Sequence, residues 1–248
     1  MRFALLCLTF AACSGFAQGP GDPPPILEIV QRPGSLRTPA KPYAETGAAI
    51  NVIGMSAVTG LPQEWFLENH FTYASVEDLD RAINAPGALH PIAEGEPART
   101  LIATWQPQWS YHPEEAARLF PQARYFNITI YRLANGTEAG FAKLAALRRA
   151  NLETRNLNRP DIAYEVISGA PSGMYLFVAP IVTLRSADEG TPNTPQYALG
   201  LADARAEVNN NTAPADISRE HLLFRVEPRL SYVSDDFAAG QEAFWRGK

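Results

Sequence analysis

The sequence predicts an α+β protein built from two tandem β-α-β-β-α-β repeats. A short phrase occurs twice, as Pro107–Tyr111 and as Pro228–Tyr232, and in each copy an apolar, strand-like run precedes the proline. A second pair of stretches, Val58–Pro62 and Ile167–Pro171, also aligns without a gap into the residues that follow. Because both stretches recur in the same order, we interpret the chain as a tandem duplication.

The first repeat runs from about Ile26 to Tyr111, and turn residues separate its strand-like runs. A weak helix is expected over Thr38–Asn51, where prolines interrupt the pattern. A better helix is expected after Ser75, which can act as the N-cap because Asp78 follows three residues later. The expected strands are Ile26–Val30, Val52–Val58, Glu64–His70 and Arg99–Gln106.

The second repeat shows the same order with stronger signals. Phe126, Ile128 and Ile130 alternate with polar side chains, which is the period-two pattern of a strand between two different surroundings. Asn135–Thr137 precedes a long amphipathic helix, and a second helix is expected over Tyr197–Val208. The expected strands are Tyr125–Arg132, Ala163–Ser168, Met174–Ile181 and Arg219–Val226.

The N-terminus has the composition of an export signal, because Arg2 precedes a short apolar run and small residues come before a cleavage point at Gln18. A lipoprotein anchored through Cys13 and an uncleaved anchor are the other interpretations. Both cysteines lie in this leader, so the mature chain would contain no disulfide. We expect an exported protein, periplasmic or extracellular. The expected organisation is a signal peptide at 1–17, a Pro/Gly-rich tether at 18–25, the first repeat and linker at 26–123, the second repeat at 124–234 and a C-terminal tail at 235–248.

The order of elements in each repeat is the ferredoxin-like order, with both helices on one face of a sheet. Together with the closing phrase Glu227–Phe237 and the pair Phe244–Trp245, it resembles exported bacterial proteins made of fused dimeric α+β-barrel domains, relatives of the antibiotic-biosynthesis-monooxygenase and NIPSNAP-like groups. The resemblance implies that the two sheets pack face to face as an intramolecular dimeric α+β barrel, so a monomer with an internal pseudo-dimer is expected. It implies a fold and a pocket location, not a reaction.

Charge and motifs exclude several functional classes. The net charge of −5 and the scattered Lys and Arg residues give no basic face for nucleic acid. The serine-hydrolase elbow, the His-Glu-x-x-His zinc motif, Gly-rich phosphate loops and EF-hand spacing do not occur. The apolar run of the leader is too short to span a bilayer, so no transmembrane span is expected. No metal site and no cofactor are predicted, with haem as the alternative.

Polar side chains inside strands mark the candidate site. Asn127, Thr129 and Tyr131 share one face of their strand, and Glu165 and Arg225 are ionisable residues among apolar neighbours. A buried charge is costly unless it is paired, so Glu165 and Arg225 should be paired or lie at a wet edge. One interpretation is a polar pocket between the two sheets, which would take a small apolar or aromatic molecule. The other, which the pattern favours, is a barrel interior closed by structural ion pairs.

His70 ends a predicted strand and shares a face with Glu68 and Phe66. A carboxylate beside a histidine could orient it as a base or as a haem ligand. In the alternative interpretation both side chains lie at a strand end in water. If the site is catalytic, Glu165 or His70 is the candidate base, because burial or a neighbouring charge could move either pKa.

The missing motifs favour a non-catalytic or ligand-binding protein of the cell envelope as the main functional expectation. Two alternatives stay open. One is a cofactor-independent small-molecule enzyme, monooxygenase- or isomerase-like, and the other is a binder of haem or of an aromatic ligand.

Overall fold

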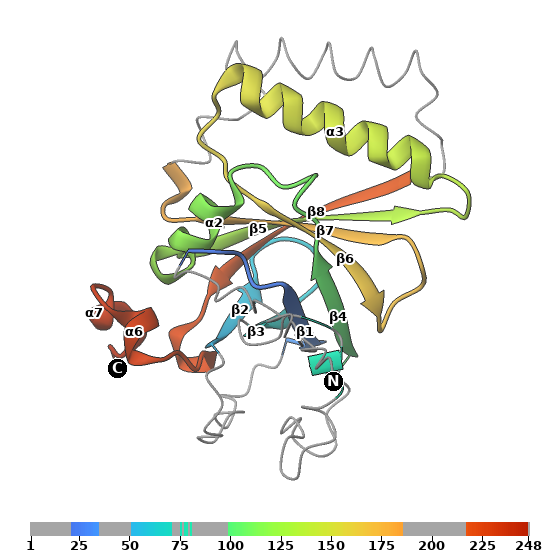
Figure 1. The fold of residues 1–248 in the computed structure, drawn as a ribbon. Coiled ribbons are helices and arrows are strands. Elements are labelled where there is room, and N and C mark those ends of the chain that lie inside the picture. The colour runs from blue at the N-terminus through green and yellow to red at the C-terminus, as the bar shows by residue number, and fades with distance from the viewer. Residues whose placement is uncertain are drawn as a thin grey trace, which may run out of the picture.

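Eight antiparallel strands form one closed barrel in the order β1-β3-β2-β8-β5-β7-β6-β4 (Figure 1). The computed structural model describes residues 21–34, 51–70 except the His70 side chain, 75, 77–78, 80, 99–185 and 217–247. The strands are β1 (Ile26–Pro33), β2 (Asn51–Ala57), β3 (Gln63–His70), β4 (Arg99–Trp105), β5 (Tyr125–Leu133), β6 (Ile162–Ser168), β7 (Met174–Ile181) and β8 (Ile217–Val226). The expected α+β class and barrel are confirmed.

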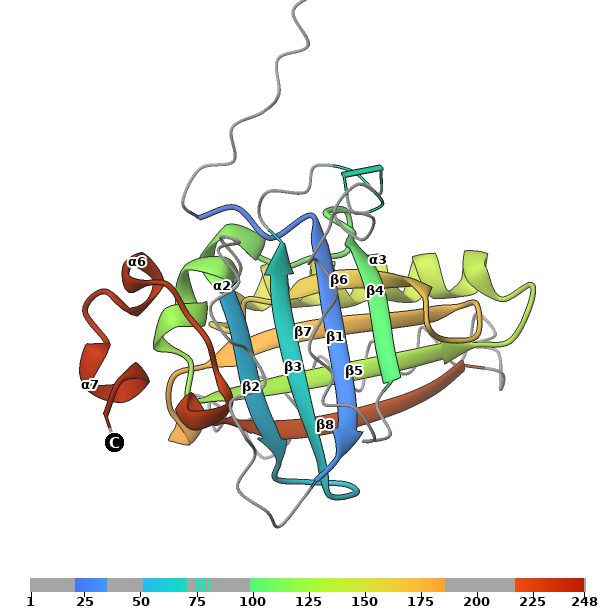
Figure 2. The same cartoon turned by 90° about the horizontal axis from the view of Figure 1, so that it is seen from below.

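Both halves of the barrel have the same strand order, β4-β1-β3-β2 in the first and β8-β5-β7-β6 in the second. The halves join where β2 pairs with β8 and where β4 pairs with β6. Strands β1 to β4 run across strands β5 to β8 on the opposite side of the barrel (Figure 2). The two predicted sheets therefore face each other within one chain.

The long helix of the second half is α3 (Glu138–Arg155), and it lies over β5 to β8 on the side away from β1 to β4 (Figure 1). The expected helix after Ser75 begins as predicted, because the Asp78 N–H donates to Ser75 Oγ and the Ser75 N–H donates to Asp78 Oδ2. The helices expected over 38–51 and 197–208 fall outside the described residues.

Apolar side chains fill most of the barrel because they occupy nearly all inward-facing alternate positions of the strands, with Asn69 on β3 as a polar exception. Large rings meet there, and Trp65 lies 4.8 Å from Phe224 between ring centroids. The inward positions of β5 are Phe126, Ile128 and Ile130, each at most 1% exposed. This interior is a packed core.

The doubled phrase makes the same contacts in both halves. Tyr111 forms a two-way backbone bridge with Asp161, which comes just before β6, and Tyr232 forms one with Val52 on β2. Each copy of the phrase therefore adds a backbone bridge from its own half of the barrel to the other half. The two bridges lie at the two junctions that close the barrel.

Three segments that we expected to be a tether, a linker and a tail pack against the barrel. Tyr164 Oη donates to the carbonyl of Pro24 over 3.1 Å, and the Trp105 N–H donates to that of Pro25 over 2.9 Å. The described part of the expected tether, 21–25, is therefore held against the barrel and does not hang free. The linker forms α2 (Pro113–Leu119) and η1 (Phe120–Gln122), and the C-terminal region forms η2 (Pro228–Leu230), α6 (Asp235–Ala238) and α7 (Glu242–Trp245).

Candidate functional site

The residues that we predicted to line a pocket between the sheets do not lie between the sheets. Asn127, Thr129 and Tyr131 were expected to face the barrel interior, but they lie on the outer face of the second-half sheet, the face that α3 covers. The cause is the phase of β5, whose apolar alternate positions enter the barrel. The residues on the polar face of this strand were predicted correctly, but the prediction that this face points into the barrel was wrong.

Glu165 and Arg225 are also on the outer face, and they are not paired with each other. Arg225 is 61% exposed and binds Glu227 over 2.7 Å, so it lies at the wet edge that we considered as an alternative. Glu165 is half-buried and accepts hydrogen bonds from Gln106 Nε2 at 3.1 Å and from Tyr175 Oη at 3.3 Å. Glu165 therefore belongs to a local polar group beneath α3.

Cross-strand pairing arranges the outer face in two adjacent rows. Neighbouring strands bring the members of each row side by side, since antiparallel partners on one face are in contact range. The rows are His221–Thr129–Phe177 and Arg219–Tyr131–Tyr175–Glu165. We call these seven residues the outer-face site.

Thr129 and His221 form the polar end of the first row. Thr129 Oγ1 lies 3.0 Å from His221 Nδ1, and Thr129 is only 9% exposed. His221 keeps an exposed edge, and its partial burial lowers its pKa, which the charges of Arg219, Arg148 and Arg159 lower further. His221 is therefore neutral at physiological pH, and a neutral imidazole is able to accept a proton.

Tyr175 and Glu165 form the polar end of the second row. Burial, and next the neighbouring charge of Glu165, raise the pKa of Tyr175 to about 12. Tyr175 is 7% exposed and stays protonated, so its hydroxyl group is a hydrogen-bond donor at any physiological pH. The pair therefore presents the Tyr175 hydroxyl group, held in place by the Glu165 carboxylate, beside a cluster of aromatic rings.

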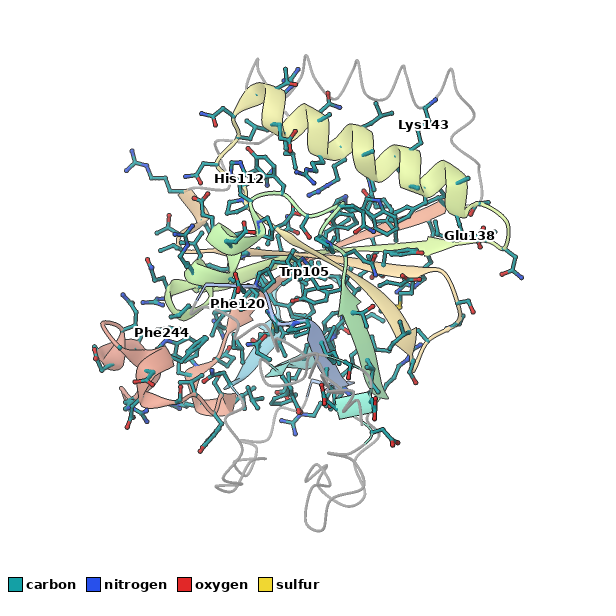
Figure 3. The ribbon with its side chains drawn as sticks, in the orientation of Figure 1. Trp105, His112, Phe120, Glu138, Lys143 and Phe244 are labelled. Carbon is teal, nitrogen blue, oxygen red and sulfur yellow. The ribbon has the colours of Figure 1, made fainter. Side chains whose placement is uncertain are left out.

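Aromatic rings make up the wall between these polar ends. Phe141 of α3 stacks on Tyr175 with centroids 4.4 Å apart, and Trp109 meets both rings edge-on at 5.2 Å. Figure 3 shows the side chains between α3 and the sheet, with Lys143 on the opposite, outward side of the helix. These rings, with Tyr131 and Phe177, are buried apart from the half-buried Trp109, and they form a second hydrophobic core beneath α3, in the offset and edge-to-face contacts that aromatic pairs prefer.

Arg148 of α3 brings a positive charge to this wall. Its guanidinium group is paired with Asp161, which is 1% exposed, and its Cζ lies 4.5 Å from the centre of the Phe177 ring. The ion pair and the cation–π contact fix the guanidinium beside the row that ends in His221.

The first half has different chemistry at the matching positions. Glu28 on β1 faces Glu68 on β3, and both are buried, so the interpretation of Glu68 as a residue in water is wrong. Glu68 shares its outer face with Phe66, as predicted, whereas the side chain of His70 lies outside the described residues. Nearby, Arg32 Nε binds Glu64 over 2.6 Å.

Sequence reasoning missed His221, Arg148 and Tyr175. Each looked ordinary along the chain, and only the β5–β8 register places His221 beside Thr129. If the sequence of β8 had been paired with that of β5, whose two faces differ, His221 could have been placed beside Thr129 from the sequence. Among the described residues, no three His, Cys, Asp or Glu side chains gather as metal ligands, and no helix is both long and apolar enough to cross a membrane.

No protein-family model and no curated protein matches the sequence. Solved structures do resemble the fold. An anthrone oxidase-like protein is 9% identical, with a TM-score of 0.47 over 82% of this chain and 91% of that one. A Lactobacillus acidophilus protein with a provisional monooxygenase assignment is 10% identical, with a TM-score of 0.46 over 85% and 99%. A provisional chlorite dismutase is 15% identical, with a TM-score of 0.43 over 86% and 97%. At these values the likeness concerns architecture and identifies no substrate.

The main functional expectation is corrected. We expected a non-catalytic or ligand-binding envelope protein, whereas the structures that resemble this fold are described as oxidase-like, monooxygenase or dismutase proteins. The small-molecule enzyme, which was our alternative, is taken up below as a proposal and argued from the outer-face site.

Proposed function

We propose that this protein is a cofactor-independent, monooxygenase-like enzyme that acts on an aromatic substrate at the outer-face site. The observation that carries the proposal is the Thr129–His221 pair, in which a histidine with a lowered pKa adjoins aromatic rings, the ion-paired Arg148 and the exposed Arg219. A base and positive charge beside a cluster of aromatic side chains together support removal of a proton from an aromatic molecule bound at the exposed end of this site.

His221 is the proposed base. We assign its ring hydrogen to Nδ1, which then donates to Thr129 Oγ1, so that Nε2 is left to accept the substrate proton. Thr129 fixes the orientation of the ring in this arrangement. Neither Glu165 nor His70, the bases expected from sequence, is needed for this step.

Arg148 and Arg219 are the proposed stabilisers of the anion that forms. Their charges disfavour protonated His221, and for the same electrostatic reason they favour a negative charge on a substrate at that place. The substrate anion then reacts with dioxygen. For an acidic methylene group the balance is R₂CH₂ + O₂ → R₂C=O + H₂O, in which the substrate supplies all the electrons.

The test separates proton removal from oxygenation. With anthrone, an aromatic ketone that has an acidic methylene group, the protein should catalyse deuterium exchange from solvent without oxygen and consume oxygen when it is admitted. His221→Asn should slow both processes by about 100-fold or more, the usual effect of losing a general base. The matched control is His112→Asn, which changes an exposed histidine at the start of α2 and should leave both rates unchanged.

Exchange at the wild-type rate in the His221→Asn variant would overturn the assignment of the base. Exchange that depends on His221 without oxygen uptake would instead show an isomerase-like enzyme. No exchange with any acidic aromatic ketone or phenol would argue against the proposed function as a whole.

We also propose that the two halves are tandem copies of one ferredoxin-like unit, which makes the chain a monomeric pseudo-dimer. The equal strand orders and the matched Tyr111 and Tyr232 bridges support this. Sedimentation of the purified protein should give a monomer.

Export through the N-terminal leader remains part of the proposal. Intact-mass measurement on protein from the envelope fraction would test it, because cleavage before Gln18 and acylation at Cys13 give different masses. A mass that includes Met1 would contradict cleavage.

A further inference from the structure

A buried amide inside the barrel has no role in the proposed reaction. Asn69 is 0% exposed, and among the described residues neither its Nδ2 nor its Oδ1 has a hydrogen-bond partner. It faces inward, because Leu67 on its own strand and Leu27, its cross-strand partner on β1, both belong to the interior cluster. Buried polar groups in folded proteins almost always have a partner, so an amide in this position requires an explanation.

The second half of the barrel provides an internal reference for this position. The alignment that matches Leu67 to Leu176 also matches Asn69 to Val178, and the registers agree, since Leu27 faces Asn69 while Ile128 faces Val178. Val178 is 0% exposed as well. The fold therefore accepts an apolar side chain here, and packing alone does not require the amide.

We propose that Asn69 binds a small neutral guest inside the barrel, one that both donates and accepts hydrogen bonds. The side-chain amide presents two N–H donors and a carbonyl acceptor. Apart from Asn51, its partner on β2, the described inward neighbours Leu27, Leu67 and Ala103 are apolar, and none of these residues is charged, so a neutral guest is favoured over an ion. Two sources share this chemistry: a water molecule held within the fold, or a small amide taken up from solution.

Asn51 connects this position to the surface. It is the cross-strand partner of Asn69 on β2, it is half-buried, and its Oδ1 accepts a hydrogen bond from the Ser234 N–H over 2.9 Å. The guest would enter here, between the start of β2 and the segment that leads into α6. On the other side, the residues that precede β1 are held by the hydrogen bond from Tyr164 to Pro24.

Two substitutions test the guest. Asn69→Leu is close to isosteric, and Asn69→Val copies the equivalent position of the second half. If a guest is bound, both variants lose its hydrogen bonds, and Tm should fall by about 2–4 °C or more. If the amide has no guest, both variants remove a buried polar group without a partner, and Tm should rise. The reciprocal control, Val178→Asn, should lower Tm and create no binding.

The source of the guest follows from two measurements on the wild-type protein. Water-oxygen magnetic relaxation dispersion should show a long-lived internal water that Asn69→Leu removes, if the guest is water. Acetamide should raise the Tm of the wild type and not that of Asn69→Leu, if the guest is an amide. Neither signal, or a higher Tm in Asn69→Leu, would overturn the proposal. Should both variants fail to fold, the two wild-type measurements decide it, with Val178→Asn as the reference.

Discussion

Ser110 and Ser231 make equivalent hydrogen bonds at the two junctions of the barrel. Ser110 Oγ accepts from the Ala163 N–H over 3.0 Å, and Ser231 Oγ accepts from the Gly54 N–H over 3.0 Å. Each hydroxyl group also donates to the carbonyl four residues earlier in the chain. The serine of the doubled phrase thus joins the end of one half to the second strand of the other.

Replacing these serines should destabilise the protein. Ser231→Ala leaves the Gly54 N–H without its partner, which costs about 1–3 kcal/mol for a buried group. Ser110→Ala should cost more, because Trp105 Nε1 also donates to Ser110 Oγ over 3.1 Å. Urea unfolding measures both effects. Ser218→Ala, at an exposed position of β8, is the control and should stay within about 0.5 kcal/mol of the wild type.

Gly54→Ala should be among the more damaging small substitutions. An added Cβ would lie 2.4 Å from Leu230 Cβ and 2.7 Å from the Leu230 carbonyl oxygen. Overpacking of this kind costs about 1–3 kcal/mol. Because one of the two clashes involves backbone, the double variant Gly54→Ala/Leu230→Ala should not recover the stability of Leu230→Ala alone in thermal unfolding. Full recovery would show that the loop moves freely.

The strands were predictable because apolar alternation and turn residues are local signals. All eight expected strands occur, and Met174–Ile181 has the expected bounds. Thr137 is the N-cap of α3, close to where its turn residues placed the helix start. The packing of 21–25 could not be predicted, since it depends on Tyr164, which is distant in sequence.

The site was harder to predict, because alternation gives two faces and does not say which one enters the barrel. The prediction correctly put Asn127, Thr129 and Tyr131 on one face of their strand, but it pointed that face into the barrel when it points outward. The partner of Thr129 is His221, and that pairing depends on the register between β5 and β8 across a long sequence separation. Periodicity within one strand carries no information about register.

The pKa of His221 should lie below its ordinary value of 6.5 in the folded protein, because of burial and the arginine charges. The unfolded chain then binds the proton more tightly, so the contribution to stability is present above about pH 6.5 and is lost as the pH falls. NMR titration measures the pKa, with His221→Asn to assign the signal. Arg219→Ala should raise this pKa. Arg229→Ala, at an exposed position that is not among these charges, should leave it unchanged.

Tyr175 should titrate near pH 12, above its ordinary value of 10.0. Because the folded-state pKa is raised, the contribution to stability is fully present below about pH 10 and is lost as the pH rises through 12. Glu165→Gln removes a negative charge and a charged acceptor, so it should lower the pKa of Tyr175. Ultraviolet titration measures this, with Tyr175→Phe to identify its signal. An unchanged pKa in Glu165→Gln would show that burial alone causes the shift.

Tyr164→Phe should release the segment before β1 without opening the barrel. The substitution removes one hydrogen bond, to the Pro24 carbonyl, and should cost about 0.5–1.5 kcal/mol. Two adjacent amides then report on different contacts, since the Trp105 N–H donates to Pro25 and the Gln106 N–H donates to Ala163. Hydrogen exchange at Trp105 should become faster, because local opening of the segment exposes that amide, while exchange at Gln106 should change only with the global stability. Equal acceleration at both amides would mean that Tyr164 stabilises the barrel as a whole and does not hold the segment specifically.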